Sequence, residues 1–200
     1  MGLLSRSEII ALRKDPPLES RLIITPLLDD SQIGETSVDL RLGHEFVLAR
    51  RANMPPVDPM QQNIADAEVQ RQRYQERMRI PKFGKLYLHS GEFMLGSTLE
   101  YLRLPNHIGA YVTSRSSWGR MGLVIATAVA VAPGFAGVIT LELTNLGSAP
   151  LILRPGVRIA QILFHRCLGV ERAYGGRYRC PTSPEFGKIH LDEEIPFWSK

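Results

Sequence analysis

The stretch VITLELTN, Val138–Asn145, alternates strictly between apolar and polar side chains. Successive side chains of an extended strand point to opposite faces, so this alternation is typical of a half-buried β-strand. Glu142 falls on the polar face, where most glutamates simply face solvent and a catalytic role is the alternative. The turn sequence APGFAG, residues 132–137, would deliver the strand at a fixed angle. The two faces are the apolar set Ile139, Leu141 and Leu143 and the polar set Thr140, Glu142 and Thr144.

Short apolar runs separated by Gly, Pro, Asn or Asp occupy much of the rest of the chain. Many short strands at close spacing are typical of a β-barrel or a jelly roll, so the sequence predicts a mainly β fold. The other predicted strands lie at Leu22–Ile24, Val38–Leu42, Phe46–Leu48, Leu86–Leu88, Phe93–Leu95 and Ile108–Val112.

Two further apolar runs flank a Pro155-Gly156 pair within Leu151–Phe164. Such a pair suits a type II turn, in which the glycine takes a positive φ. The sequence therefore predicts a β-hairpin over this range. Gln161 is a polar residue in its otherwise apolar second strand, and it needs a hydrogen-bond partner if it is buried.

Two segments have helical rather than extended patterns. Ser5 and Glu8 have the spacing of a capping box, which predicts a short N-terminal helix that ends before Pro16. The stretch Asn63–Ile80 is polar, lacks Gly and Pro, and carries apolar residues at near-helical intervals. It is interpreted as a surface helix or a mobile insertion within residues 50–82, with arginines that contact solvent rather than form a binding patch.

Length and composition place the chain among globular proteins. Its 200 residues suffice for one well-buried core, and 44% hydrophobic with 22% charged residues argues against disorder. The 24 Lys and Arg against 20 Asp and Glu give a net charge of +4, without the long basic block that follows a nucleic-acid backbone. This charge suits a small polyanion better than a nucleic-acid polymer. We expect a single domain over residues 1–200, ending in a C-terminal tail over 174–200.

Neither the cysteines nor the apolar runs indicate secretion or a membrane. Cys167 and Cys180 fit neither a disulfide framework nor a CxxC metal spacing. The N-terminus lacks a long apolar run behind basic residues, and no run of about 18 apolar residues occurs in the sequence. The expected protein is soluble and cytoplasmic, with no membrane partner.

The stretch TSRSSWGRMGL, Thr113–Leu123, gathers four hydroxyls and two arginines around two glycines. Serine and arginine side chains are the usual means of holding phosphate oxygens, because charge-assisted hydrogen bonds are strong. Gly119 would let the backbone approach such an anion closely. The alternative is an ordinary helix start, in which the serines cap the helix and the arginines contact solvent. The stretch alone leaves both interpretations open.

Several motifs lie along the chain in this order: SVDLRLG (37–43), HSGEFMLGST (89–98), RSSWGRMGL (115–123), PGFAG (133–137), LE (141–142) and RIAQ (158–161). Together they resemble the dCTP deaminase branch of the dCTP deaminase/dUTPase superfamily. The similarity extends over residues 3 to about 180 and is weakest in the 50–82 insertion and the tail. Separate motifs in a family's order are more specific than any one of them, and they favour phosphate binding by the Thr113–Leu123 stretch.

The resemblance implies a distorted β-barrel or jelly roll of the dUTPase-like type, with a short N-terminal helix and a helical insertion. It also implies a homotrimer whose nucleotide sites form between subunits. The implied reaction is the zinc-independent hydrolytic deamination of dCTP to dUTP and ammonia, with Mg²⁺ carried by the triphosphate. The motifs H-x-E and P-C-x-x-C, which zinc deaminases need, are both absent from the sequence.

The resemblance also implies roles for individual residues. Glu142 would be the general base that takes a proton from water and passes it toward the cytosine amino group. Ser116 and Arg120 would orient the water and stabilise developing charge, and Arg115 and Ser117 would hold the triphosphate. The other residues assigned to substrate binding are Thr127, Gln161, Tyr174 and Arg177, of which the last two belong to a tail that closes over the nucleotide.

Two departures from the family's pattern bear on this reaction. Ala132 stands where an aspartate is usual, and the loop Val124–Val131 is slightly shorter and more apolar than expected. In the dUTPase branch that aspartate activates the hydrolytic water, so its loss argues against dUTP diphosphatase activity, the lesser alternative. In the deaminase branch it helps to hold the sugar. The main alternative is therefore a catalytically impaired family member that acts as a nucleotide-binding or structural module.

Overall fold

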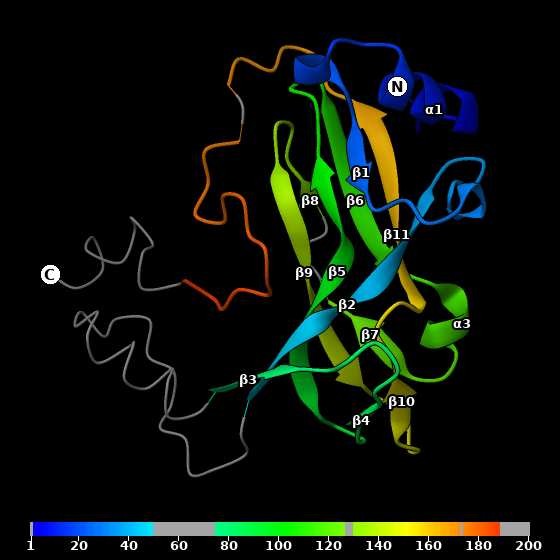
Figure 1. Cartoon of the computed structure of the whole chain (residues 1–200), viewed down its shortest axis with the longest axis vertical. Helices are drawn as coiled ribbons and strands as arrows, with labels where there is room; N and C mark the ends of the chain where they lie inside the picture. The colour runs from blue at the N-terminus through cyan, green and yellow to red at the C-terminus, as the bar shows by residue number, and fades with distance from the viewer. Residues whose placement is uncertain (1, 50–74, 127–129, 173, 189–200) are drawn as a thin grey trace, which may run out of the picture.

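The structure is a computed structural model that describes residues 2–49, 75–126, 130–172 and 174–188. Within these residues the strands form a curled nine-stranded sheet and a two-stranded sheet, which confirms the mainly β prediction. The order in the large sheet is β7-β9-β5-β2-β11-β6-β8, with β1 beside β5 and β3 beside β2. Figure 1 shows β5, β6 and β11 running roughly along the vertical axis of the molecule, with β2 crossing the view diagonally. The elements other than α1 are η1 (Leu18–Ser20), β1 (Ile23–Thr25), η2 (Asp30–Gln32), β2 (Val38–Ala49), β3 (Gln75–Arg79), β4 (Leu86–Leu88), β5 (Phe93–Arg103), β6 (Ile108–Ser114), α3 (Ser116–Gly119), β7 (Leu123–Ile125), β8 (Ala130–Val131), β9 (Ala136–Asn145), β10 (Leu151–Leu153) and β11 (Arg158–Arg166).

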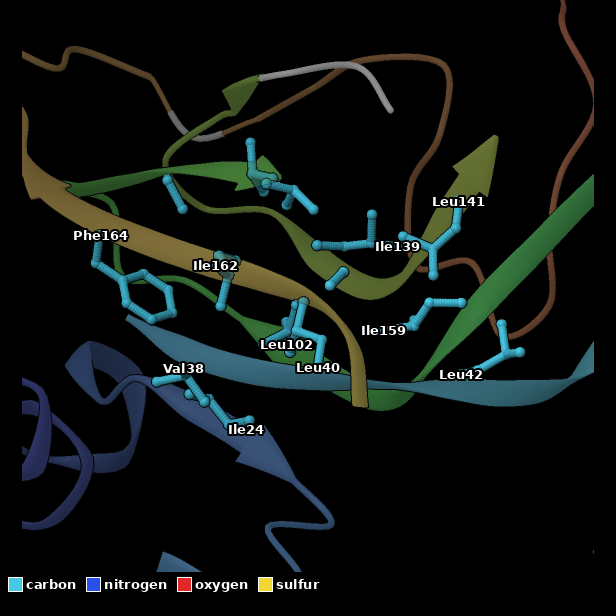
Figure 2. Packing of buried hydrophobic residues seen from close by; sticks show 14 of the residues in the cluster. Ile24, Val38, Leu40, Leu42, Leu102, Ile139, Leu141, Ile159, Ile162 and Phe164 are labelled. Atoms are coloured by element: carbon cyan, nitrogen blue, oxygen red, sulfur yellow. The ribbon is translucent and has the colours of Figure 1, made fainter. Parts of the chain in front are cut away.

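The alternating stretch forms the centre of β9, and its apolar face is buried as predicted. Ile139, Leu141 and Leu143 all belong to the hydrophobic core. Burying one such side chain fully stabilises the fold by about 1.5–3 kcal/mol, so the core fixes the face that Glu142 takes. Figure 2 shows core side chains from β2, β9 and β11 meeting between the strands, among them Leu40, Leu42, Ile139, Leu141, Ile159 and Ile162.

The N-terminal helix α1 (Arg6–Lys14) begins at the predicted capping box. The Glu8 N–H donates a hydrogen bond to the Ser5 hydroxyl at 3.4 Å, and the Ser5 N–H donates one to the Glu8 carboxylate at 2.9 Å. Ile9 and Leu12 are the buried residues of this helix and join the core. The prediction of a short helix that ends before the two prolines is confirmed.

The predicted hairpin over Leu151–Phe164 is wrong, although its turn forms. Gly156 has a φ of 86°, and the Val157 N–H donates to the Arg154 carbonyl at 3.3 Å. However, β10 pairs with β4 in the two-stranded sheet. Both edges of β11 are already occupied, one by β2 and the other by β6, so no edge of β11 is left for β10.

Of the two interpretations of Asn63–Ile80, a surface helix or a mobile insertion, the helix is wrong at its C-terminal end, where residues 75–79 form the strand β3. The other residues of this prediction, 63–74, lie outside the described residues. Along one edge of β2, β11 pairs only as far as Arg41, and β3 takes over from Glu45 onwards. Pairing with this edge satisfies backbone groups of β2, and such tertiary pairing overrides a weak helical pattern.

None of the helices in the described part of the chain has the length and hydropathy that crossing a membrane requires.

Candidate active site

Glu142 lies in the wall of a cleft of about 590 Å³ between β9 and the C-terminal segment, Tyr174–Lys188. Most of the other wall residues are apolar, and the hydroxyls come from Thr140, Tyr174 and Tyr178. We call this hollow the glutamate cleft. Its lining residues are Gln75, Phe93, Leu95, Ala130, Val131, Ala132, Phe135, Val138, Ile139, Thr140, Glu142, Tyr174, Tyr178, Pro181, Glu185, Phe186 and Gly187.

Strands on both sides hold Glu142 in place. It lies opposite Leu95 of β5, and its backbone carbonyl accepts a hydrogen bond from the Ala126 N–H at 2.9 Å. The residue is half-buried on the polar face of β9, and this burial raises the pKa of its carboxyl group. No hydrogen bond or ion pair reaches that carboxylate from any other residue that the structure describes. A half-buried carboxylate with a raised pKa and free oxygens is suited to accept a proton from water.

The C-terminal segment forms the second wall of the glutamate cleft. The Tyr174 N–H donates to the Pro133 carbonyl at 3.0 Å, and the Tyr174 ring contacts Phe135 with 5.9 Å between ring centroids. Tyr174 therefore lies in the same cleft as Glu142. Arg177 does not line this cleft; its Nη1 donates to the Lys188 carbonyl at 3.3 Å.

Ala132 and its neighbours form an apolar part of the cleft wall. The turn itself forms as predicted, because the Phe135 N–H donates to the Ala132 carbonyl at 3.1 Å and Gly134 has a φ of 79°. The methyl group of Ala132 offers no hydrogen bond where the resemblance leads one to expect a carboxylate. Thr127 and its two following residues lie outside the described residues, so the predicted role of Thr127 is untested.

The other predicted residues lie on α3 and the residues around it, Arg115–Arg120, which we call the arginine–hydroxyl segment. A helix does start here, but Arg115 is its N-cap and no side chain caps it. Ser116, Ser117 and Arg120 are exposed, so their polar groups are accessible to a ligand. The Trp118 Nε1 donates to the Arg158 carbonyl at 3.0 Å and attaches this segment to β11. The capping serines of the alternative interpretation are thus not found.

Asp39 belongs to the motif SVDLRLG, but the resemblance assigned it no role of its own. The Gln161 Nε2 donates to its Oδ1 at 3.0 Å, and the Arg115 Nε lies 3.4 Å from the same oxygen. The Arg158 Nη1 lies 3.4 Å from its Oδ2. Two predicted substrate-binding residues therefore share one carboxylate, which also supplies the partner that Gln161 requires. The indication in the sequence was the position of Asp39, a charged residue, within the predicted strand Val38–Leu42.

A single chain does not bring all predicted residues together. The glutamate cleft contains Glu142 and Tyr174, but none of its lining residues belongs to the arginine–hydroxyl segment. Figure 1 shows α3 at the right of the sheet and the C-terminal segment at the left. Gln161 lies with the arginine–hydroxyl segment through Asp39. One chain thus presents two partial sites, a carboxylate in a cleft and an exposed set of hydroxyls and guanidinium groups.

Among the residues that the structure describes, no group of three or more His, Cys, Asp or Glu side chains is arranged to hold a metal ion.

Comparison with known proteins identifies relatives of this chain. Residues 3–167 match the protein family described as dCTP deaminase-like. A dCTP deaminase of Haloarcula marismortui is 42% identical over 183 residues, which cover 87% of this chain and 90% of that protein. A protein of Coprothermobacter proteolyticus named dCTP deaminase, dUMP-forming, is 42% identical over 176 residues, which cover 86% of this chain and 89% of that protein. The crystal structure of 2'-deoxycytidine 5'-triphosphate deaminase from Agrobacterium tumefaciens matches with a TM-score of 0.61 and 25% identity, covering 83% of this chain and 48% of the other.

Proposed function

This chain belongs to the dCTP deaminase-like family, and from that premise we propose that it hydrolyses dCTP to dUTP and ammonia in the cytoplasmic nucleotide pool. In this reaction the oxygen of water forms a bond to C4 of cytosine, and the exocyclic amino group leaves as ammonia. The observation that carries the proposal is the half-buried Glu142 carboxylate in a cleft, with a raised pKa and no protein partner among the described residues.

The proposed chemistry assigns one task to each group. Glu142 removes a proton from the attacking water and delivers it to the departing amino group, so that no net proton is consumed by the protein. Ser116 and Arg120 orient the water and stabilise the charge that develops on the ring. Arg115 and Ser117 bind the triphosphate, which carries its own Mg²⁺. Zinc is not assigned a role, since the zinc-deaminase motifs are absent from the sequence.

We propose further that the two partial sites meet between subunits of a homotrimer. Within one chain the lining of the glutamate cleft includes no residue of the arginine–hydroxyl segment. In a ring of identical subunits, each contact joins one surface of a chain to a different surface of its neighbour. The glutamate cleft of one subunit can therefore face the arginine–hydroxyl segment of the next. Each complete site would then combine Glu142 of one chain with Ser116 and Arg120 of its neighbour.

Turnover of dCTP is the direct test of the proposed function. The purified protein is incubated with dCTP and Mg²⁺, and dUTP and ammonia are measured together. Equal amounts of the two products support the proposal. Tight binding of a nucleotide without turnover of dCTP, dCMP or CTP would instead select the nucleotide-binding or structural alternative.

The product is expected to be dUTP rather than dUMP, although some relatives are named dUMP-forming. Ala132 supplies no carboxylate to activate a water at the phosphates, so pyrophosphate should not accumulate with ammonia. Chromatography of the nucleotides and a pyrophosphate assay on the same samples check this expectation, with added dUTP as the control substrate. Pyrophosphate released in step with ammonia would show the dUMP-forming reaction.

The raised pKa of Glu142 predicts the acid limb of the pH profile. Glu142 must be ionised to accept a proton, so kcat/KM should fall about tenfold per pH unit below its pKa. Because burial raises that pKa, the fall should begin at a higher pH than an ordinary glutamate would produce. Initial rates across the acid range, with circular dichroism at each pH to verify folding, measure this limb. A rate that stays constant down to the ordinary glutamate range would contradict the assignment.

A further inference from the structure

Asp39 is a nearly buried carboxylate, 7% exposed, to which the proposed reaction gives no task. Strand pairing determines its neighbours. Asp39 of β2 lies opposite Gln161 of β11, and Gln161 lies opposite Thr113 of β6, two residues before Arg115. The carboxylate therefore lies at one end of a row that crosses three strands and leads to the arginine–hydroxyl segment.

The contact with Asp39 determines the direction of the Arg115 guanidinium. The Arg115 Nε lies 3.4 Å from the Asp39 Oδ1. Among the described residues, Asp39 is the partner of this guanidinium. A guanidinium is planar and rigid, so fixing its Nε edge also fixes the direction of the two terminal amino groups. The Arg115 side chain is 35% exposed, so part of it remains accessible to an anion.

The same oxygen determines the orientation of the Gln161 amide. An ionised carboxylate only accepts hydrogen bonds, so the end of Gln161 that faces Asp39 must be its nitrogen. Its Nε2 donates to Oδ1 at 3.0 Å, and the amide oxygen is consequently turned away from Asp39. Arg158 holds the second carboxylate oxygen and is itself bound to Asp29, whose Oδ2 lies 2.7 Å from its Nη2.

We propose that Asp39 is a positioning residue for nucleotide binding: it holds Arg115 and Gln161 in the directions in which they contact the substrate, with Arg115 directed at the polyphosphate. The inference rests on the proposed function, because the triphosphate is the ligand assigned to Arg115. It adds a residue whose side chain acts through two others and contacts neither the cytosine ring nor the attacking water.

Replacing Asp39 by asparagine tests the proposal. Gln161 and Arg158 donate hydrogen bonds to the carboxylate and Arg115 forms an ion pair with it, so the amide nitrogen of the new side chain would face a donor and release one of these partners. We expect the KM for dCTP to rise at least about tenfold while kcat changes less than about threefold. The affinity for dCMP, which lacks the outer phosphates, should change less than about threefold. The preference for dCTP over dCMP would therefore decrease.

Asp29→Asn is the matched control, because Asp29 contacts Arg158 and Arg41 but neither Arg115 nor Gln161. Its KM for dCTP should stay within about twofold of the wild type. Equal increases of KM in the two variants, or no increase in Asp39→Asn, would overturn the proposal. Arg115→Lys keeps the charge but lacks the Nε, so it should reproduce the increase even if Asp39→Asn does not fold; an unchanged KM in this variant would also overturn the proposal.

A binding measurement separates this inference from the proposed function. Calorimetric titration with inorganic tripolyphosphate and Mg²⁺ needs no turnover, and it should give an affinity at least about tenfold weaker for Asp39→Asn than for Asp29→Asn. If the wild type does not turn over dCTP but the two variants differ in tripolyphosphate affinity as expected, the deamination is refuted and the role of Asp39 stands. If the wild type deaminates dCTP but the two variants bind tripolyphosphate equally well, the proposed function stands and the role of Asp39 is refuted.

Discussion

Replacing Glu142 by glutamine is expected to lower kcat for dCTP deamination by at least about 100-fold, with KM changed less than about threefold. The amide has nearly the shape of the carboxylate but cannot accept the water proton. The burial that raises the pKa of Glu142 also keeps the side chain in the cleft, so the substitution removes the base without opening the site. Steady-state kinetics with dCTP and calorimetric binding of the nucleotide measure the two parameters separately.

Glu19→Gln is the control for this substitution, because Glu19 is an exposed glutamate in η1, outside the glutamate cleft. Its kcat should equal that of the wild type. A Glu142→Gln protein that retains more than about a tenth of the wild-type kcat would show that another group is the base. The assignment of Ser116 and Arg120 to the same water would then also lose its support.

Mixing two inactive variants is expected to restore activity if the sites form between chains. Glu142→Gln subunits keep the arginine–hydroxyl segment, and Ser116→Ala subunits keep the glutamate cleft. In closed rings assembled at random from equal amounts of the two, about one site in four combines an intact cleft with an intact segment. Coexpression of the two variants in equal amounts, purification of all assemblies by one tag that both variants carry, and measurement of kcat per site would give this fraction.

The double variant Glu142→Gln with Ser116→Ala, coexpressed with wild-type chains, is the matched control for subunit exchange. It places both lesions in one chain, so a site between chains is intact only where two wild-type chains meet, again about one site in four. A site within one chain would instead keep about half of the activity in this control and none in the mixture of single variants. The two arrangements are thereby distinguished without a structure of the oligomer.

Local patterns in the sequence predicted those parts of the fold that depend on near neighbours along the chain. The capping box at Ser5 and Glu8 gave α1, and alternation gave the buried face of β9. The turn at Gly156 also formed. The hairpin prediction failed because pairing partners are chosen among distant strands, and β11 was already bordered by β2 and β6. The helical pattern before Ile80 failed for a similar reason, since the edge of β2 recruited residues 75–79.

The predicted site depended on family motifs, which identify residue types without their contacts. Resemblance selected Glu142, Ser116 and Arg120, but within one chain the glutamate cleft contains the first of these and neither of the other two. The motif SVDLRLG contains Asp39 but does not reveal its partners, because Arg115 and Gln161 are separated from it by 76 and 122 residues in the chain and only the pairing of three strands brings them together.

The sequence by itself therefore determined the strand character of the chain, the polar face that carries Glu142, the start of the first helix and the family. These features follow from side-chain periodicity, from hydrogen bonds between near neighbours and from the order of motifs. The tertiary structure alone decided which strands are neighbours, how far Glu142 is buried, and that Asp39 contacts both Arg115 and Gln161. Such features depend on contacts between residues far apart in the chain, where the free energy of packing and pairing selects one partner among many that are locally equivalent.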